Sequence, residues 1–328
     1  MTFDQIIMKC IILAAGYATR LYPLTENFPK PLLEVSGKPI LDWLIDDMSQ
    51  TGLIDEYIVI SNHKFAPIFE QWASSKVEGT QSKGLSQRDS VEGTQTKGLS
   101  QKDSIEGTQS KGLSQKDSVE GTQTKGLSQK DSLRPSTESL RPTSLDLRPN
   151  PLDIKVLDDG TSSNETRLGA VRDIQFAIDQ LNLDDDLLVM AGDNLLDFSL
   201  GDFIRYAKDK QATCVMRYYE NDEARLHKTG VAEIDADGRI LSLEEKPANP
   251  KSHWCIPAFY YYTRQDARLI KKGIENGCGV DAPGSFIAWL ATQTTVYTYE
   301  MPGRCYDIGT LASYEAVKNS FPPSSQKL

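Results

Sequence analysis

The sequence predicts an α/β fold, in which a mostly parallel sheet carries helices on both faces and a long repetitive insert interrupts the chain. Short apolar runs typical of buried strands alternate with segments of helical periodicity. Some of these runs end at a glycine, as expected where the carboxyl ends of parallel strands form a ligand-binding edge. Near-identical 14-residue units separate the two parts of the chain that show this alternation.

The elements follow from apolar spacing and turn residues, in chain order. Residues 10–15 (CIILAA) form an apolar run before Gly16 and predict the first buried strand. Residues 39–50 have a proline near their start and apolar residues at helical spacing, which predicts a helix. Asp237-Gly238 predicts a turn between strand-like segments. Further strands are predicted at residues 57–60, 187–191, 213–218, 230–234 and 258–262.

The repetitive block begins with VEGTQSKGLSQRDS at residues 77–90. Near-copies follow at 91–104, 105–118 and 119–132, and three short units that open Leu-Arg-Pro complete the block. Each 14-residue unit carries two acids, two bases and few aliphatic residues. It therefore offers little apolar surface to offset an ordering entropy of about 1–2 kcal/mol per residue. We predict a disordered insert at residues 77–150; a binding arm and a repeat solenoid are the alternatives.

The remainder of the chain fits a single domain. Removing the 74 residues of the insert from 328 leaves 254, a normal size for one α/β domain. That domain is formed by residues 1–76 and 151–328.

Composition narrows the class of function. The net charge of −10 argues against a nucleic-acid binder. The mean hydropathy is −0.42, and no apolar run approaches the roughly 20 residues of a membrane helix. The five cysteines are scattered and include no C-x-x-C pair, which argues against disulfides and structural zinc and fits a reducing cytoplasm. We therefore expect a cytoplasmic protein without nucleic-acid or membrane partners.

The loop after the first predicted strand reads LAAGYATRLYPLTENFPKPLLEVSGKPIL over residues 13–41. Gly16 and its small neighbours suit a close approach of backbone N–H groups to phosphate oxygens. Arg20 and Lys30 are cations ten residues apart on a path stiffened by prolines. Neither the G-x-x-x-x-G-K-[ST] nor the G-x-G-x-x-G pattern is present. Each cation taken alone is explained as well by a solvated side chain.

Together, these residues resemble the signature of the sugar-1-phosphate nucleotidylyltransferases, most of all the glucose-1-phosphate thymidylyltransferases. That signature reads L-A-x-G-x-G-T-R-L-x-P-x-T, with a lysine ten residues after the arginine. The matching residues are Leu13, Ala14, Gly16, Thr19, Arg20, Leu21, Pro23, Thr25 and Lys30. Ala18 stands where the family usually has glycine, and its Cβ would crowd a positive φ angle. The resemblance implies that Arg20 holds the leaving pyrophosphate and Lys30 the α-phosphate.

Two aspartates occupy positions of the family's metal ligands. Asp193 lies in Gly-Asp-Asn directly after the predicted strand at 187–191, and Asp307 lies in YDIGT. A lone aspartate in a Gly-Asp-Asn segment is equally typical of a turn. The resemblance implies that both residues bind Mg²⁺, which prefers one or two carboxylates plus phosphate oxygens.

A second motif, SLEEKPANPKS at residues 242–252, resembles the sugar-phosphate segment of the same family. The resemblance implies that Glu245 accepts hydrogen bonds from sugar hydroxyls and that Lys246 holds the sugar phosphate. Gly230 matches a glycine beside the sugar ring, and Tyr260 matches a sugar-site tyrosine. Pro257-Ala258 replaces the usual Thr-Gly, so the identity of the sugar stays open. A solvated charge run is the alternative for this segment.

The nucleotide-binding residues are implied by the same resemblance. Backbone groups of Leu13, Ala15 and Gly16 would line the nucleotide. The Leu-Gly-Ala segment containing Gly169 fits a motif in which a glycine backbone contacts the base. Asn164 stands five residues earlier, where related enzymes place a base-reading glutamine. Residues 171–173 depart from the family pattern, so the base stays open.

The implied activity joins an NTP and a sugar 1-phosphate to give an NDP-sugar and pyrophosphate, with Mg²⁺ as cofactor. The implied fold is the Rossmann-like nucleotide-diphospho-sugar transferase fold. The substrates are the expected partners, and a homo-oligomer is left open. Alternatives are a phosphocholine cytidylyltransferase, a non-catalytic nucleotide-sugar-binding protein on the same fold, and an interaction protein acting through the repeats.

Overall fold

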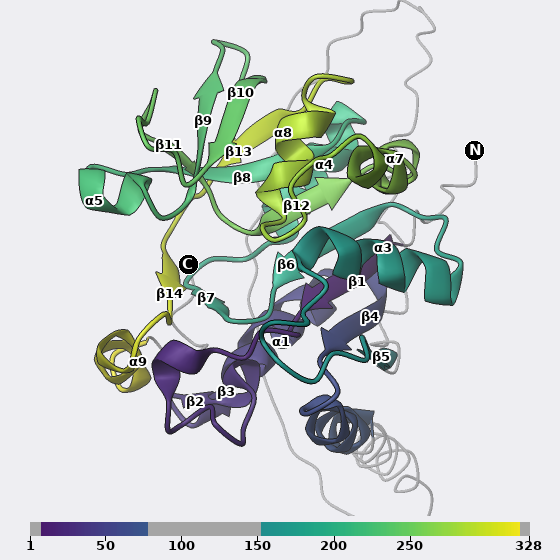
Figure 1. The fold of residues 1–328 in the computed structure, drawn as a ribbon, viewed down its shortest axis with the longest axis vertical. Helices are drawn as coiled ribbons and strands as arrows, with labels where there is room; N and C mark the ends of the chain where they lie inside the picture. The colour runs from purple at the N-terminus through teal and green to yellow at the C-terminus, as the bar shows by residue number, and fades with distance from the viewer. Residues whose placement is uncertain (1–7, 78–151, 322–328) are drawn as a thin grey trace, which may run out of the picture. The chain divides into compact units, whose positions relative to one another are not determined.

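The computed structural model describes residues 8–77 and 152–321, which build a mixed sheet flanked by helices (Figure 1). Within these residues the main sheet has ten strands in the order β10-β9-β11-β8-β12-β6-β1-β4-β5, with β13 paired to β8. The strands are β1 (Met8–Leu13), β4 (Ile54–Ser61), β5 (Ile154–Asp158), β6 (Leu187–Ala191), β8 (Cys214–Tyr219), β9 (Gly230–Ile234), β10 (Ile240–Glu245), β11 (Trp254–Ile256), β12 (Phe259–Tyr262) and β13 (Tyr297–Glu300). The predicted insert at 77–150 lies outside the described residues except for Val77, which is helical.

The part of the sheet that carries the expected ligand edge is parallel. β1 pairs in parallel with β4 and β6, and β4 pairs in parallel with β5. Leu13 lies opposite both Ile60 and Ala191, so these strands end at one edge of the sheet. β12 pairs antiparallel with both β6 and β8, where an antiparallel extension begins. The predicted α/β fold is confirmed, and the sheet is mixed because of this extension.

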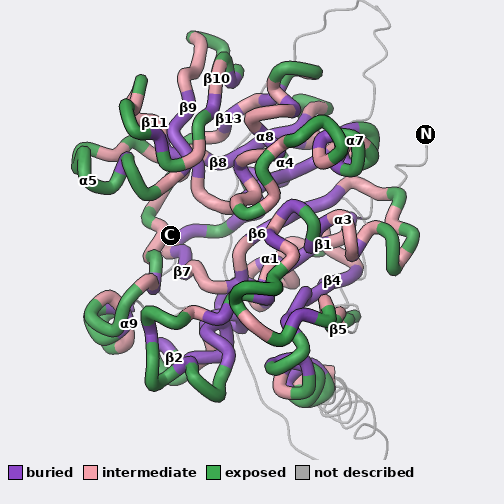
Figure 2. Tube along the Cα trace, viewed as in Figure 1, coloured by how far each residue is buried: buried purple, intermediate pink, exposed green. Residues whose placement is uncertain are grey.

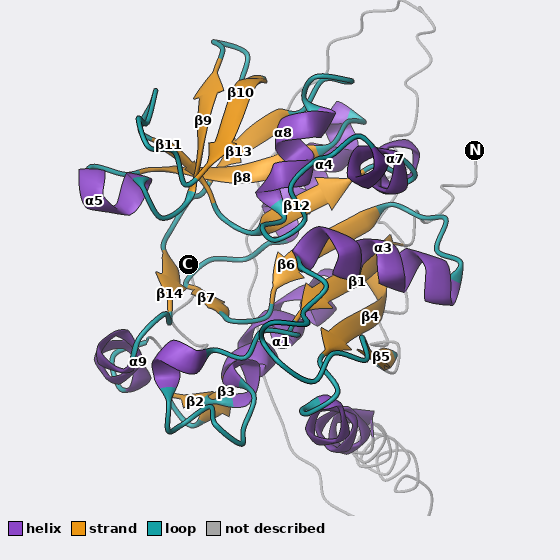
Figure 3. Cartoon of the chain, in the orientation of Figure 1, coloured by secondary structure: helices purple, strands orange, loops and turns teal. Residues whose placement is uncertain are grey.

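Helices cover both faces of the sheet (Figure 3). They are α1 (Ile40–Thr51), the helix at residues 66–77, α3 (Ala170–Leu181), α4 (Gly201–Lys210), α5 (Glu223–Leu226), α6 (Arg264–Ala267), α7 (Ile270–Glu275), α8 (Gly284–Leu290) and α9 (Leu311–Lys318). One apolar cluster packs β1 against α1, the 66–77 helix and α4, and a second packs β1 against α3, α7 and α8. Among the described residues, none of the helices combines the length and apolar character that crossing a membrane requires.

Local sequence explains the central strand and its first helix. Ile11 and Ile12 of β1 are both fully buried, although successive strand residues face opposite sides of the sheet. A continuous apolar run is therefore needed here, and burying each isoleucine contributes about 1.5–3 kcal/mol (Figure 2). α1 begins after Pro39 and ends at Thr51. The next residue, Gly52, has a φ of +64°, a conformation that glycine adopts at little cost.

The predicted boundaries agree closely with these elements. The strands predicted at 187–191 and 230–234 coincide with β6 and β9, and the helix predicted at 39–50 is α1 shifted by one residue. β1 ends two residues before the predicted end, because Ala14 and Ala15 already belong to the loop. The predicted turn connects β9 to β10, and Gly238 adopts a φ of +81° there.

Two short antiparallel pairs lie outside the main sheet. β2 (Glu34–Val35) pairs with β3 (Lys38–Pro39), and β7 (Asn194–Leu196) pairs with β14 (Cys305–Asp307). The hydroxyl of Tyr314 in α9 donates a hydrogen bond to the Glu34 carbonyl at 2.9 Å. The second pair brings a late segment of the chain to the carboxyl end of β6.

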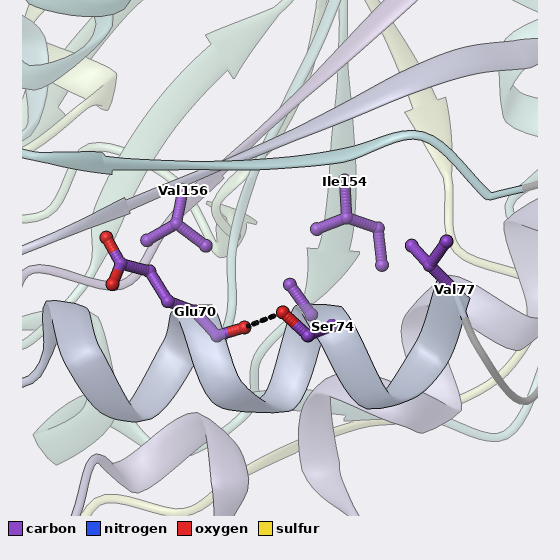
Figure 4. Close-up of a pocket in the computed structure, with 6 residues that line it drawn as sticks. Glu70, Ser74, Val77, Ile154 and Val156 are labelled. Carbon is purple, nitrogen blue, oxygen red and sulfur yellow. Dashed lines mark hydrogen bonds between the residues drawn. The ribbon is translucent and has the colours of Figure 1, made fainter.

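A surface cavity lies between the 66–77 helix and β5 (Figure 4). Its lining consists of Glu70, Ala73, Ser74, Val77, Ile154 and Val156. The Ser74 hydroxyl donates a hydrogen bond to the Glu70 carbonyl at 2.9 Å. None of the predicted site residues lines this cavity, so it is separate from the candidate site.

Candidate active site

A charged centre joins one lysine and two aspartates from three separate segments. Lys30 Nζ lies 2.7 Å from Asp193 Oδ2 and 3.9 Å from Asp307 Oδ1. The Lys30 side chain is only 7% exposed, whereas the side chains of Asp193 and Asp307 are 38% and 78% exposed. A buried ammonium therefore meets two carboxylates that stay accessible to a ligand. The structure brings together three residues that the sequence predicted for one site.

Two backbone contacts position the aspartates. The Gly192 N–H donates a hydrogen bond to the Leu13 carbonyl at 3.0 Å, which ties the turn after β6 to the end of β1. A Cβ at Gly192 would lie 2.9 Å from Ile12 Cγ2, so a larger residue would push this turn away. Asp307 ends β14 and pairs with Asn194 in β7, beside Asp193. Asp193 and Asp307 are thus fixed by the sheet edge and by the short β7–β14 ladder.

Asp197 anchors β14 and was not predicted from the sequence. Its Oδ1 accepts a hydrogen bond from the Arg304 N–H at 2.7 Å, and its Oδ2 accepts one from the Tyr306 hydroxyl at 3.3 Å. Both donors lie on or directly before the strand that ends at Asp307. The sequence gives no local signal for this contact, because the partners are distant in the chain.

The loop after β1 is open at its glycine and tightly turned after it. Apart from its two chain neighbours, none of the residues described by the structure comes within 4 Å of the position that a Cβ at Gly16 would take. Ala18 adopts the left-handed conformation, with a φ of 48°, at the position where a glycine was expected. Its carbonyl accepts hydrogen bonds from the Thr25 hydroxyl at 2.8 Å and the Leu21 N–H at 2.9 Å. The loop therefore keeps its turn with alanine, and Arg20 follows on an exposed 3-10 turn.

Asn62 forms a hydrogen bond with the backbone of this loop and was not predicted from the sequence. It is fully buried, its Nδ2 donates to the Ala15 carbonyl at 2.9 Å, and its Oδ1 accepts from the Phe65 N–H at 3.1 Å. The Tyr17 hydroxyl donates to the Thr161 carbonyl at 3.2 Å. A polar residue directly after the apolar strand β4 is the signal that identifies Asn62.

The segment before α3 contains the two residues predicted for the base. Gly169 has a φ of +91°, and a Cβ there would lie 2.6 Å from the Val280 carbonyl oxygen. A glycine is therefore required by the close approach of two backbone segments, independently of any ligand. Asn164 lies on an exposed turn, and no hydrogen bond joins it to Gly169 in the part of the chain that the structure describes.

A half-buried carboxyl, Asp159, and a buried one, Asp173, lie near this segment. Asp159 Oδ1 accepts hydrogen bonds from the Thr161 N–H and hydroxyl, both at 2.7 Å. Asp159 Oδ2 and Asp173 Oδ1 are buried without a hydrogen-bond partner among the described residues. Burial raises the pKa of Asp173 to about 7, and the charge of Asp159 adds to the rise. Asp173 is thus close to half protonated at neutral pH.

The predicted sugar-site residues gather on β9, β10 and β12. Gly230 lies opposite Glu245 in the β9–β10 ladder, and a Cβ at Gly230 would lie 3.1 Å from Glu245 Oε1. Burial raises the pKa of Glu245, and the charge of Lys246 opposes that rise. Tyr260 is only 2% exposed, and its pKa is raised well above the usual value by burial and by Glu245. Three of the four predicted residues therefore form one polar cluster.

Lys246 and Arg20 differ from Lys30, the third cation of the site, because they form no ion pair with a described carboxylate. Lys246 is exposed at the end of β10, with a φ of 50°, and its N–H donates to the Thr229 carbonyl at 3.0 Å. Across residues 8–77 and 152–321, neither Lys246 nor Arg20 has a carboxylate within 4 Å of its charged group. Both cations are therefore free to meet an anionic ligand.

The charged centre suits a divalent cation. The described residues contain no cluster of three or more histidine, cysteine, aspartate or glutamate ligands. Asp193 and Asp307 nevertheless each place a carboxylate oxygen within 4 Å of the same Lys30 ammonium. Two carboxylates of this kind fit Mg²⁺ when phosphate oxygens complete its coordination.

The model of the nucleotidyl transferase family matches residues 9–103 and 152–322. These ranges cover most of the chain, and the chain therefore belongs to the nucleotidyl transferase family. The match extends into the repetitive block as far as residue 103.

Three curated relatives describe the similarity further. A glucose-1-phosphate adenylyltransferase of Fervidobacterium nodosum is 27% identical over 39% of this chain, but the alignment spans only 31% of that protein's length. A UTP–glucose-1-phosphate uridylyltransferase of Haloferax volcanii is 23% identical over 78% of this chain and 72% of its own. A choline-phosphate cytidylyltransferase of Streptococcus pneumoniae is 47% identical over 53 residues, which are 16% of this chain and 23% of that protein.

Solved structures share the fold. A UDP-glucose pyrophosphorylase complexed with UDP-glucose aligns with a TM-score of 0.61 at 14% identity, covering 96% of this chain and 98% of that chain. A putative glucose-1-phosphate thymidylyltransferase from Bacillus anthracis aligns with a TM-score of 0.60 at 18% identity, covering 97% and 98%. At these identities the likeness shows the fold alone, and it confirms the nucleotide-diphospho-sugar transferase fold.

Proposed function

We propose that the chain transfers a nucleotidyl group from an NTP to a sugar 1-phosphate, giving an NDP-sugar and pyrophosphate. The observation that carries this proposal is the charged centre, where Lys30 Nζ lies 2.7 Å from Asp193 and 3.9 Å from Asp307. Asp193 follows the carboxyl end of the parallel strand β6. Family membership and the relatives named for glucose 1-phosphate support the same class of reaction.

The proposed reaction needs no general base. The nucleophile is a phosphate oxygen whose second pKa is about 6, so it is largely ionised at neutral pH. Catalysis then rests on alignment of the reacting groups and on neutralisation of phosphate charge. In this mechanism Lys30 holds the α-phosphate, Arg20 holds the leaving pyrophosphate, and Lys246 orients the sugar phosphate. Lys30 is held in place by Asp193 before substrate binds, which makes its charge preorganised.

Mg²⁺ is the proposed cofactor, and Asp193 and Asp307 would hold it. The bound ion supplies additional neutralisation of phosphate charge during transfer. Lys30 offsets part of the repulsion between the two carboxylates, which keeps them close together.

The nucleotide is proposed to lie over the loop after β1. Backbone groups of Leu13, Ala15 and Gly16 line it, and the open space above Gly16 leaves room for its close approach. The Gly169 backbone and the Asn164 side chain are proposed to contact the base. Which base is bound is the first question for the assay below.

The sugar is proposed to bind at Gly230, Glu245 and Tyr260. A carboxylate accepts hydrogen bonds from hydroxyls, while a phenol both donates and accepts them. Glu245 and Tyr260 lie close enough for the charge of Glu245 to raise the tyrosine pKa. This combination suits a ligand with several hydroxyl groups, such as a hexose.

Phosphocholine cytidylyltransferase activity is the second candidate. The 47% identity to a choline-phosphate cytidylyltransferase over 53 residues favours it. Phosphocholine carries no hydroxyl groups, so the hydrogen-bonding pair of Glu245 and Tyr260 favours a sugar. A non-catalytic nucleotide-sugar-binding protein would bind the same ligands without releasing pyrophosphate.

A pyrophosphate-release panel tests the proposal. Each of the four NTPs and dTTP is combined with the 1-phosphates of glucose, mannose and N-acetylglucosamine and with phosphocholine, in the presence of Mg²⁺. We expect one NTP and sugar pair to dominate. Turnover with CTP and phosphocholine alone would establish the second candidate instead. Ligand binding without pyrophosphate release from any pair would favour the non-catalytic alternative.

The Lys30→Met variant tests the charged centre. Removing a preorganised cation from a site of developing charge commonly costs about 10²–10³ in rate. Lys271→Met is the matched control, because Lys271 is exposed on α7 and belongs to none of the proposed binding groups. Equal turnover by the two variants on the preferred pair would refute the assignment of Lys30.

A further inference from the structure

Glycines border the Glu245 carboxylate on two sides. Gly230 of β9 lies opposite Glu245, where an added Cβ would come within 3.1 Å of Oε1. Gly284, the first residue of α8, lies on another side. A Cβ at Gly284 would lie 3.1 Å from Glu245 Cδ and would overlap Oε1. The carboxylate therefore occupies space that any side chain at residue 284 would fill.

Tyr260 borders the same space. Its hydroxyl oxygen lies 3.6 Å from the position of a Cβ at Gly284. Burial and the charge of Glu245 both raise the pKa of Tyr260, which agrees with this proximity. One residue from α8 thus meets the two side chains that we propose contact the sugar.

The backbone of Gly284 does not itself require glycine. Its φ lies outside the left-handed range, unlike that of Gly169 at +91°. Alanine also has the higher intrinsic helix propensity, so helix formation by itself does not favour glycine at residue 284. The clash at residue 284 is with the end of a flexible side chain, which moves more easily than backbone. The feature that distinguishes glycine from alanine here is the room left for Glu245.

We infer that Gly284 is a positioning residue of the sugar site, because the absence of a side chain lets the Glu245 carboxylate lie beside Tyr260. The inference rests on the proposed sugar-1-phosphate function. In Gly284→Ala the backbone stays in place and the carboxylate moves away from the tyrosine hydroxyl. A sugar bound by both groups then loses its hydrogen bonds to the Glu245 carboxyl group.

The test is a double-mutant cycle with Gly284→Ala, Glu245→Ala and the double variant. Initial rates are measured with glucose 1-phosphate varied at saturating UTP, and then with UTP varied at saturating glucose 1-phosphate. If the panel identifies a more active NTP and sugar pair, that pair replaces them. We expect Gly284→Ala to lower kcat/KM for the sugar 1-phosphate by about 10- to 100-fold and to leave the KM for the NTP nearly unchanged. In the Glu245→Ala background the same change should have little further effect, because no carboxylate remains to be displaced.

Gly273→Ala is the matched control. A Cβ at Gly273 would lie 2.9 Å from Phe286 Cδ2 in α8, so this variant disturbs the packing of the same helix without touching Glu245. We expect Gly273→Ala to lower the Tm without selectively lowering kcat/KM for the sugar 1-phosphate.

Four outcomes overturn the inference. Equal losses from Gly284→Ala with and without Glu245 would show that the glycine acts independently of the carboxylate. An unfolded Gly284→Ala would show that the carboxylate is not the group that yields. Wild-type kinetics of Gly284→Ala beside a strong loss in Glu245→Ala would remove the inference and leave the proposed function standing. A Glu245→Ala variant with wild-type sugar kinetics would remove the proposed sugar site as well.

Discussion

Replacing Asp173 with asparagine should stabilise the folded protein at neutral and alkaline pH. Asp173 is only 6% exposed, and its Oδ1 has no hydrogen-bond partner within the described residues. Burial raises its pKa from 3.8 to about 7, and Asp159 contributes further by repulsion. The protonated carboxyl is therefore the form that the fold accepts, and the ionised form destabilises it.

The size and sign of the effect follow from the pKa. Each pKa unit corresponds to about 1.4 kcal/mol, so ionised Asp173 lowers the free energy of unfolding by at most about 4 kcal/mol relative to its protonated form. The contribution of the protonated carboxyl is fully present below pH 3.8 and is lost as the pH rises to about 7. Asp173→Asn has no such titration, so its advantage over the wild type should grow through this window and level off above it.

Urea unfolding of the wild type and of Asp173→Asn between pH 5 and pH 8 measures the difference. We expect the two free energies of unfolding to diverge by about 3 kcal/mol across this range, with the variant more stable at pH 8. Asp179→Asn is the control, because Asp179 is exposed on the same helix and should leave the pH profile unchanged. Parallel profiles for the wild type and Asp173→Asn would refute the reasoning.

Three further predictions concern the proposed metal ligand Asp307, the loop after β1 and the repetitive block. Asp307→Asn should raise the Mg²⁺ concentration needed for half-maximal activity and weaken Mn²⁺ binding measured by electron paramagnetic resonance, and an unchanged metal response would contradict the proposed ligand. Ala18→Gly should raise the free energy of unfolding by up to about 1 kcal/mol with activity retained, because a φ of 48° is strained for alanine. Urea unfolding measures this change, and a less stable variant would contradict the prediction. Replacing residues 78–150 with a short Gly/Ser linker should preserve kcat and KM. Val77 and Ile154 line one cavity, so a short linker can connect the two segments that flank the replaced residues (Figure 4). Loss of activity in the purified, folded variant would show that the block has a structural role.

The sequence predicted the buried strands well and the short ladders not at all. β6 was found at its observed bounds because its continuous apolar run, LLVMA, marks a buried strand. β9 was also found at its observed bounds, as the strand-like segment before the Asp237-Gly238 turn. β7 and β14 have three residues each, too few for a periodic pattern, and they pair across a long stretch of chain. Their pairing is a consequence of tertiary structure, which local spacing does not contain.

For the site, the sequence identified the charged residues but not the residues that position the loop and side chains of the site. Lys30, Asp193 and Asp307 stand in recognisable motifs, and the structure places the three together. Asn62 and Gly284 were missed, because their importance lies in one buried hydrogen bond and one close contact with distant residues. The roles proposed for Asn164, Lys246 and the other predicted residues stay predictions until the variants are measured.

The β7–β14 ladder also determines when the charged centre can form during synthesis. A ribosome adds roughly 5–20 residues per second from the N-terminus, so β1, β4 and β6 are complete well before residue 307 is made. Throughout that interval the nascent chain has Lys30 and Asp193 but lacks the second carboxylate. The parallel strands can therefore pair while the charged centre, our proposed metal site, is still incomplete. A nascent chain folded to this stage would have its central strands in place, and the complete charged centre would arrive only with the late strand β14.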